Sequence, residues 1–264
     1  MEVNGTFYGL QQPKSFLRWR AESPPDFIFT LKAPRYITHI LRLGDAKGAV
    51  ANFFASGPLA LGPKLGPILW QLPPSFRFSA DRLAAFLELL PHDTAAATKL
   101  AAQHDRPIKG GAYLTAEENL PVRHALEIRH DSFRTPKFIE LLRAHDAALV
   151  VADAVEWPCF QDVTSDFIYA RLHGSEELYA SRYTTEALDN WARRFRSWAN
   201  GREPRDAKRI GGRSPQRHKR DVFVFFDNDA KVHAPFDAIR LAKRLGVVIR
   251  RPGKDFRPPK QNAM

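Results

Sequence analysis

The sequence predicts an α/β fold of the TIM-barrel type, in which parallel strands alternate with helices and close into a ring. Short apolar runs rich in β-branched and aromatic residues recur along the 264 residues, and helical patterns lie between them. Several runs, such as AALVVAD, are apolar almost throughout, which is typical of parallel strands covered on both faces. Seven or eight such units in about 250 residues favour a barrel over an open sheet.

The predicted strands are short apolar runs that end in polar residues. In chain order they are residues 3–7, 27–31, 68–71, 125–128, 148–152, 167–172 and 222–226, with 246–250 as a weaker eighth.

Four helices are predicted between these strands, at residues 79–90, 135–145, 184–201 and 234–246. The second has Thr135 as its expected N-cap and Pro136 at the first helical position, where a missing N–H costs nothing. The third has Thr184 or Thr185 as its cap and Gly201 as its stop.

The chain has no clean linker, so we expect one domain at residues 1–245, with a basic insertion at 201–220 and a basic, Pro-rich tail at 246–264. No apolar run approaches the roughly 18 residues that a membrane span needs. The single cysteine, Cys159, excludes an internal disulfide and fits a reducing compartment. We expect a cytoplasmic protein that does not contact membranes.

The net charge of +11 lies mainly in two segments. Residues 201–220 contribute +6 and residues 250–264 contribute +4, which leaves +1 for the rest of the chain. Both segments are rich in Gly, Pro and polar residues, as mobile loops and tails are. Non-specific attraction to nucleic acid is therefore expected through these segments alone.

Polar side chains of the kinds that bind or react stand at the end of strand after strand. In a parallel barrel the carboxyl ends of the strands open on one face, so these side chains should converge there. Turn formation and helix capping explain Asp or Asn after a strand, but not Lys32, Gln71, Arg171 or His173. Alternation along a strand also puts pairs on one face, namely Glu127 with Arg129, Arg171 with His173, and Asp227 with Asp229.

Several blocks occur in one order from residue 1 to about 245: VNGTFY, FTLKAPRYITH, LGPKLGPILWQLPPSF, LEIRHDSF, VVADA, FIYARLHG with Tyr179 and Tyr183 downstream, and FFDND followed by HAP. In these blocks the chain resembles the DUF72 (YecE-like) family. The resemblance implies a TIM-barrel-like fold, similar in architecture to sugar isomerases and to endonuclease IV, without an established activity. It also implies that the polar positions of these blocks belong to the family's characteristic set.

The chain departs from the family pattern in three places. The usual first strand, with a Gly-Thr-Ser-Gly-Trp-type segment, and its helix are absent. MEVNGTFY is therefore expected to be the second strand of a barrel that is incomplete at its N-terminus, through a misplaced start or a true truncation. Phe133 stands where a Trp is usual, and the insertion at 201–220 is longer than expected.

The first functional hypothesis is an acid–base enzyme, isomerase- or hydrolase-like, that acts on a small polar or anionic ligand such as a sugar or sugar phosphate. Glu127 is expected to act as base or acid, His173 as its complement, and Arg171 as the anion clamp. Two carboxylates facing across the mouth would also suit glycoside hydrolysis. The candidate catalytic residues are Glu127, His173, Asp227 and Glu2, and the candidate ligand-binding residues are Asn4, Lys32, His39, Gln71, Arg129, Asp153, Arg171 and Asn228.

Other hypotheses remain open at this point. A divalent metal could use Glu2, Glu127, Asp153 and His173, but the interleaved Arg and Lys side chains would compete with it, so no metal or other cofactor is predicted. A nucleic-acid-binding or endonuclease-IV-like function is the first alternative. A truncated, non-catalytic protein, prone to pairing through exposed sheet edges, is the second.

Overall fold

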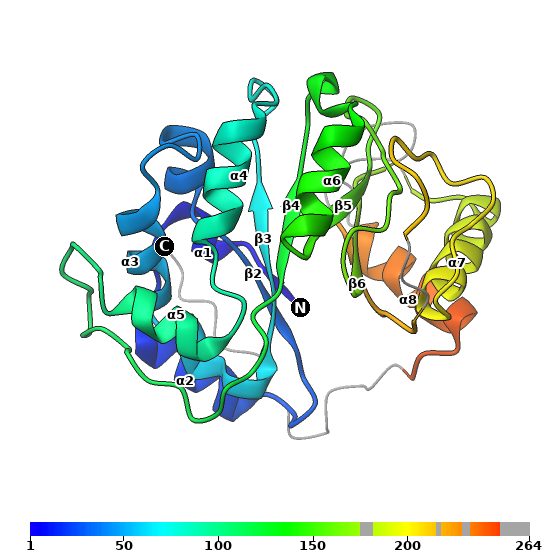
Figure 1. Ribbon diagram of the computed structural model, residues 1–264. Coiled ribbons are helices and arrows are strands. Elements are labelled where there is room, and N and C mark those ends of the chain that lie inside the picture. The colour runs from blue at the N-terminus through cyan, green and yellow to red at the C-terminus, as the bar shows by residue number, and fades with distance from the viewer. Residues whose placement is uncertain (175–181, 215–217, 229–232, 249–264) are drawn as a thin grey trace.

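A parallel sheet of seven strands forms the centre of the computed structural model, which describes residues 1–174, 182–214, 218–228 and 233–248 (Figure 1). Each strand is hydrogen-bonded to the next one in sequence, in the order β1 to β7. The strands are β1 (Glu2–Val3), β2 (Phe29–Lys32), β3 (Leu65–Gln71), β4 (His124–Glu127), β5 (Ala147–Asp153), β6 (Phe167–Leu172) and β7 (Asp221–Phe226). All six pairings are parallel, so the predicted α/β barrel is confirmed.

The sheet curves until its first and last strands approach each other. No backbone pairing between β1 and β7 occurs in the described part of the chain. Side chains cross the barrel interior instead, since the Tyr169 hydroxyl on β6 donates to the Glu2 carboxylate on β1 at 2.6 Å. The result is a nearly closed barrel.

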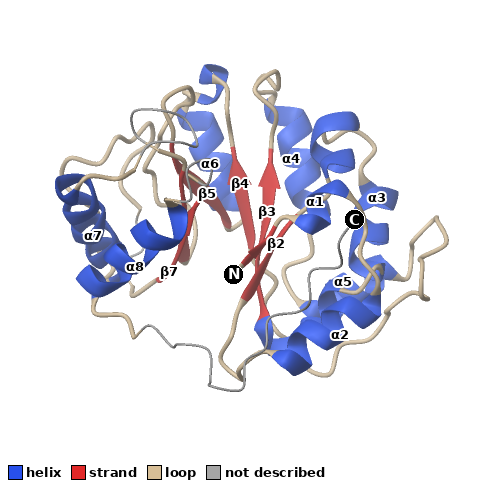
Figure 2. Ribbon diagram, turned by 180° about the vertical axis from the view of Figure 1, so that it is seen from behind, coloured by secondary structure: helices blue, strands red, loops and turns tan. Residues whose placement is uncertain are grey.

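Helices cover the outside of the sheet (Figure 2). They are α1 (Gly5–Tyr8), α2 (Pro13–Glu22), α3 (Lys47–Ala55), α4 (Ala80–Leu89), α5 (Thr94–Ala101), α6 (Pro136–Ala144), α7 (Thr185–Ala199) and α8 (Ala234–Leu245), with a π-helical turn at Tyr36–Ile40 and 3-10 turns at Pro58–Lys64 and Asp131–Phe133. Helices α4, α6, α7 and α8 correspond to the four predicted ones, whereas α2, α3 and α5 were not predicted.

Side-chain alternation along the strands sorts the core into two layers. One layer lies between the strands and the helices and contains, for example, Trp70 and Val151. The other fills the barrel interior and consists of Leu69, Ala125, Ala148, Val150, Phe167 and Tyr169, with Phe223 and Phe225 packed against them. Residues that continue this inner series past the strand ends therefore point into the mouth of the barrel.

The prediction of a strand at residues 3–7 is wrong beyond Val3. The backbone turns into the right-handed helical region at Asn4, and residues Gly5–Tyr8 form α1. The Thr6 hydroxyl donates to the carbonyl of Val3 at 3.0 Å and to that of Lys32 at 2.8 Å, which fixes this turn against β2. The other six strands begin and end within three residues of the predicted positions.

The weak eighth strand is absent from the residues that can be described there. Gly246 ends α8 in the left-handed conformation, with φ of 71°, and residues 247–248 belong to no strand. Residues 249–250 and the rest of the predicted tail lie outside the described residues.

The basic insertion is held against the body where it is described, contrary to the expectation of a mobile loop. The Asp162 carboxylate accepts the backbone N–H groups of Ile210 and Gly211 at 2.9 and 2.8 Å. The backbone N–H of Gln161 donates to the carbonyl of Lys208 at 2.8 Å. Residues 215–217 lie outside the described part.

None of the described helices is both long enough and apolar enough to cross a membrane.

Candidate functional site

Side chains that point into the barrel from six strands lie together at the carboxyl ends of these strands. Arg171 and His173 continue the series of Tyr169, just as Asp227 continues that of Phe225. The residues that this alternation brings to the mouth are Glu2, Lys32, Gln71, Glu127, Arg129, Arg171, His173 and Asp227.

Arg171 lies at the centre of this cluster and is 1% exposed. Its Nε and Nη2 atoms donate to the two oxygens of Glu2 at 3.1 and 3.0 Å, and its Nη1 donates to Glu127 at 2.8 Å. Nη2 also donates to Asp227 at 3.0 Å. One buried guanidinium therefore joins carboxylates from β1, from β4 and from the end of β7, and its own pKa stays well above the usual value despite burial.

Glu127 is fully buried and accepts hydrogen bonds on both oxygens. Oε1 accepts from Gln71 at 2.8 Å and from Arg129 at 2.7 Å, while Oε2 accepts from Arg171. Burial alone would raise the pKa of Glu127, but the charges of Arg171 and Arg129 reverse this and hold it well below the usual range. Glu127 is therefore an ionised anchor for two arginines.

Asp227 and His173 lie next to each other at the same end of the barrel. The His173 Nδ1 atom is 3.2 Å from the Asp227 carboxylate, and its Nε2 atom is 3.5 Å from Arg171. Burial would raise the pKa of Asp227, but its hydrogen bond with His173 and the charge of Arg171 lower it. The ring of Trp157 packs edge-on against His173 and face-on under the Arg129 guanidinium, 3.6 Å from its centroid.

Lys32 lies at the end of β2. Unlike Arg129 and Arg171, it forms no ion pair with a described carboxylate. Its Nζ atom lies 4.1 Å from the centroid of the Phe7 ring, and no described residue accepts a hydrogen bond from it. Burial and the nearby charge of Arg171 lower the pKa of Lys32 to about 8. A measurable fraction of this amine is therefore neutral at physiological pH.

His39 comes from the π-helical turn that follows β2. Its Nδ1 atom lies 2.9 Å from the Thr38 hydroxyl, and the edge of its ring contacts Phe7. Burial, together with Arg35 and Arg129, lowers the pKa of His39 to about 4, so the imidazole is neutral at physiological pH.

A pocket of about 510 Å³ opens over this cluster, a size typical of small-molecule sites. Asn4, Lys32, His39, Gln71, Arg129, Arg171 and Asp227 line it, together with Phe7, Tyr8 and Arg35. Seven of the twelve predicted residues thus face one cavity, and Glu2, Glu127 and His173 contact the lining residues from behind.

The last two predicted residues lie on the opposite face of their strands. Asp153 follows the series of Val151 and accepts hydrogen bonds from Tyr183 at 2.9 Å and Trp191 at 3.2 Å, beside a separate pocket of about 730 Å³. Asn228 follows Phe226 and donates to Asp237 of α8 at 3.0 Å. The structure does not bring either to the mouth, and Asp229 and Tyr179 lie outside the described residues.

Phe7, Tyr8 and Arg35 line the pocket but were not among the predicted site residues. Phe7 and Tyr8 reach it because residues 5–8 form a helix instead of a strand. Arg35 lies three residues after Lys32 in the block FTLKAPRYITH, and this closeness to a predicted site residue could have indicated that it belongs to the site.

Within the described residues, no three His, Cys, Asp or Glu side chains are grouped in a way that could hold a metal ion. Of the four ligands considered from the sequence, Glu2 and Glu127 are bonded to Arg171 and Asp153 lies on the other strand face. The carboxylates of the mouth thus interact with arginines instead of with each other.

Fold and site together define a TIM-barrel-like α/β protein with a polar pocket at the carboxyl ends of its strands. The family model described as "Protein of unknown function DUF72" matches residues 1–262, and the chain belongs to this family.

Relatives and solved structures agree with this assignment. UPF0759 protein YecE from Escherichia coli K12 is 37% identical over 93 residues, which is 34% of this chain and 34% of that protein, so the match covers about a third of the relative. A DUF72 family protein from Thermotoga maritima superposes with a TM-score of 0.67 at 26% identity, over 93% of this chain and 84% of that one. A DUF72 family protein from Enterococcus faecalis V583, at 18% identity, shares the fold with a TM-score of 0.61, over 94% and 89% of the two chains.

Proposed function

We propose that this protein is an acid–base enzyme that moves a proton on a small phosphorylated sugar, next to its carbonyl group. The observation on which the proposal rests is Lys32, a buried amine at the floor of the pocket with a pKa of about 8. A base works best when its pKa is close to the operating pH, and a lysine reaches this range only when its environment disfavours the charge.

Each neighbour of Lys32 supports a defined role. Arg35 and Arg129 line the same pocket and offer charge to a phosphate group. His39 is neutral because its pKa is near 4, and a neutral imidazole can donate a hydrogen bond from its ring N–H to a carbonyl oxygen. Asn4 and Gln71 add amide groups for the hydroxyls of a sugar.

The carboxylates suit a supporting role better than the acid–base role expected from the sequence. Glu127 accepts three hydrogen bonds and its pKa lies well below the usual range, which makes it a weak base at neutral pH. Glu2 and Asp227 are likewise bonded to Arg171. In this proposal the three carboxylates hold Arg171 in place, and Glu127 also holds Arg129. Burial and the charge of Arg171 keep the Lys32 pKa low.

The test is exchange of carbon-bound hydrogen in D₂O, followed by proton NMR with dihydroxyacetone phosphate, ribulose 5-phosphate and fructose 6-phosphate as probes. We expect deuterium to enter the carbon next to the carbonyl group of at least one probe, at a rate that rises as pH passes through about 8. Replacement of Lys32 by Met should lower the rate by a factor of roughly 100 or more.

Lys47→Met is the matched control, because Lys47 is exposed at the start of α3. Exchange that continues unchanged in Lys32→Met, or no exchange with any probe in the native protein, would rule the proposal out.

A further inference from the structure

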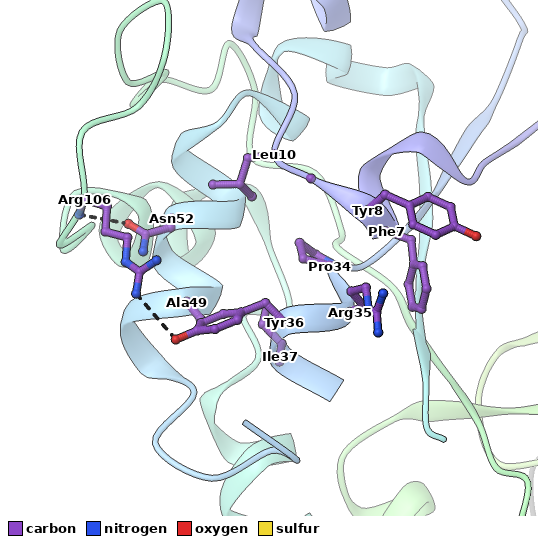
Figure 3. Close-up of a pocket in the computed structure, with 11 residues that line it drawn as sticks. Phe7, Tyr8, Leu10, Pro34, Arg35, Tyr36, Ile37, Ala49, Asn52 and Arg106 are labelled. Atoms are coloured by element: carbon purple, nitrogen blue, oxygen red, sulfur yellow. Dashed lines mark hydrogen bonds between the residues drawn. The ribbon is translucent and has the colours of Figure 1, made fainter. Parts of the chain in front are cut away.

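An apolar pocket of about 180 Å³ lies beside the polar one (Figure 3). Its lining includes Leu10, Pro34, Tyr36, Ile37 and Ala49. These residues come from the segment after α1, the end of β2, the π-helical turn and α3, so the pocket is formed by the loops that follow the first two strands. Nothing in the role proposed for Lys32 requires such a pocket.

Three residues belong to both pockets: Phe7, Tyr8 and Arg35. Figure 3 shows them together on one side of the apolar pocket, while the Tyr36 ring extends toward Arg106 on the other. Tyr8 is 75% exposed, and at this shared boundary its ring contacts the Phe7 ring edge-on. A ligand that passes these three side chains would occupy both pockets at once.

The far wall of the apolar pocket has its polar groups already bonded to the protein. Asn52 donates to the Asp105 carboxylate at 2.7 Å and accepts the backbone N–H groups of Asp105 and Arg106. Arg106 donates to the Tyr36 hydroxyl at 3.4 Å and stacks over the Tyr36 ring. This wall therefore favours an uncharged, apolar group over a second polar one.

The size of the pocket suits one aromatic ring. An apolar cavity of about 150 Å³ accommodates benzene, so a pocket of about 180 Å³ has room for one phenyl group. The edges of Phe7, Tyr8 and Tyr36 offer the ring partners that aromatic groups prefer. The adjacent Arg35 and Arg106 disfavour a cationic ring.

We propose that the apolar pocket is an aryl subsite, and that the ligand of this protein is a small phosphorylated sugar carrying a single uncharged aromatic ring. The sugar phosphate would lie over Lys32, Arg35 and Arg129, and the ring would pass Phe7 and Tyr8 to reach Ala49. The sugar phosphate half of this inference rests on the proposed function, whereas the aryl half rests on the apolar pocket alone.

Two binding measurements test the inference. The first compares phenyl glucoside 6-phosphate with glucose 6-phosphate by calorimetry, and the aryl compound should bind about tenfold more tightly to the native protein. The second follows fluorine NMR line broadening of 4-fluorobenzyl alcohol, a neutral ring without phosphate, which should bind weakly by itself.

Ala49→Leu fills the pocket, because Ala49 lines it without reaching the polar pocket. It should abolish both the tenfold advantage and the broadening while leaving the affinity for glucose 6-phosphate unchanged. Leu10→Trp is a second blocking variant, from the exposed side of the pocket, in case the first one disturbs α3. Ala85→Leu, on an exposed position of α4, is the matched control.

The outcomes separate the two proposals. If neither glucose derivative binds but the fluorinated alcohol binds in a manner that depends on Ala49, the aryl subsite is supported and the sugar phosphate half of the inference is overturned, while the proposed function is decided by the exchange test. Equal affinities for the two glucose derivatives, or broadening of the fluorinated alcohol that persists in both blocking variants, would overturn the aryl subsite.

Discussion

Arg171 is the residue on which the geometry of the mouth depends. It bonds three carboxylates that come from β1, from β4 and from the end of β7, and these strands are far apart in sequence. A buried charge of this kind stabilises a fold only while its partners remain, because each of them has given up water. The contribution of Arg171 is therefore best measured by removing it.

Replacement of Arg171 by Met should lower the free energy of unfolding at pH 7 by about 3–5 kcal/mol. The charge of Arg171 helps to hold the pKa values of Glu127 and Asp227 low, so its contribution is present above the unfolded carboxyl pKa of about 4.3 and is lost below it. The deficit of the variant should therefore be full at pH 7 and smaller at pH 3, below the unfolded carboxyl pKa.

Urea unfolding monitored by tryptophan fluorescence at both pH values measures this. Arg18→Met is the control, because Arg18 is exposed and its ion pair with Glu22 is 3.9 Å long. It should change stability by no more than about 0.5 kcal/mol. The assigned role would be contradicted if the Arg171 variant lost no unfolding free energy at pH 7, or if its loss were the same at both pH values.

The alternation of side chains decided which predicted site residues meet. It was applied in the sequence to pairs such as Arg171 and His173, and the structure has both at the mouth. The same two-residue alternation puts Asp153 on the face of Val151, which packs against the helices, and not on the face of Val150, which points into the barrel. The position of Asp153 was therefore predictable, whereas the hydrogen-bond partners of Arg171 required coordinates because they come from separate strands.

At the scale of the element, helix ends show what local sequence determines. Thr135 was predicted as one N-cap and either Thr184 or Thr185 as another, and the structure has Thr135 and Thr184 at these positions. Only the Thr184 hydroxyl accepts a backbone N–H, that of Ala187 at 3.1 Å, while Thr135 makes no such bond. The position of a cap follows from the sequence, but its hydrogen bond depends on the rotamer that packing allows.

Thr184→Ala should therefore cost about 1 kcal/mol of stability, the usual value for a lost N-cap bond. Thr135→Ala should cost only a few tenths of a kcal/mol, since no cap bond is lost. Thermal unfolding of the two variants side by side makes the comparison, and equal losses would show that the difference in capping has no energetic consequence.

The first strand marks the limit of local prediction. VNGTFY contains β-branched and aromatic residues, as strands do, yet only Glu2–Val3 pair with β2. The Thr6 hydroxyl bonds the carbonyl of Lys32, 26 residues away, and this tertiary contact outweighs the strand propensity of the segment. The pocket residues Phe7 and Tyr8 were missed for the same reason.

At the scale of the whole molecule, the described part of the basic insertion is separate from the site. The described part of the insertion packs against residues 161–162, which lie between β5 and β6 and do not line the mouth pocket. Arg213 and Lys219 of the insertion are exposed. Any affinity for nucleic acid should then arise from phosphate attraction and not from the pocket.

We expect DNA duplexes of unrelated sequence to bind with equal affinity, falling about tenfold or more between 50 and 200 mM salt. The double variant Arg213→Gln with Lys219→Gln should lower the slope of affinity against salt concentration, while Lys32→Met should leave it unchanged. Fluorescence anisotropy measures both. Sequence preference that survives at 200 mM salt would favour the nucleic-acid alternative.

The pKa of Lys32 is the measurement that tests the proposed function most directly. Protein labelled with ¹³C at the lysine ε-carbons can be titrated by NMR, with the Lys32 signal assigned from its loss in Lys32→Met. The structure predicts an inflection near pH 8, well below the value of about 10.4 for an ordinary lysine. An inflection at or above pH 10 would show a permanently charged lysine at the floor of the pocket, and the proposed proton transfer would be wrong.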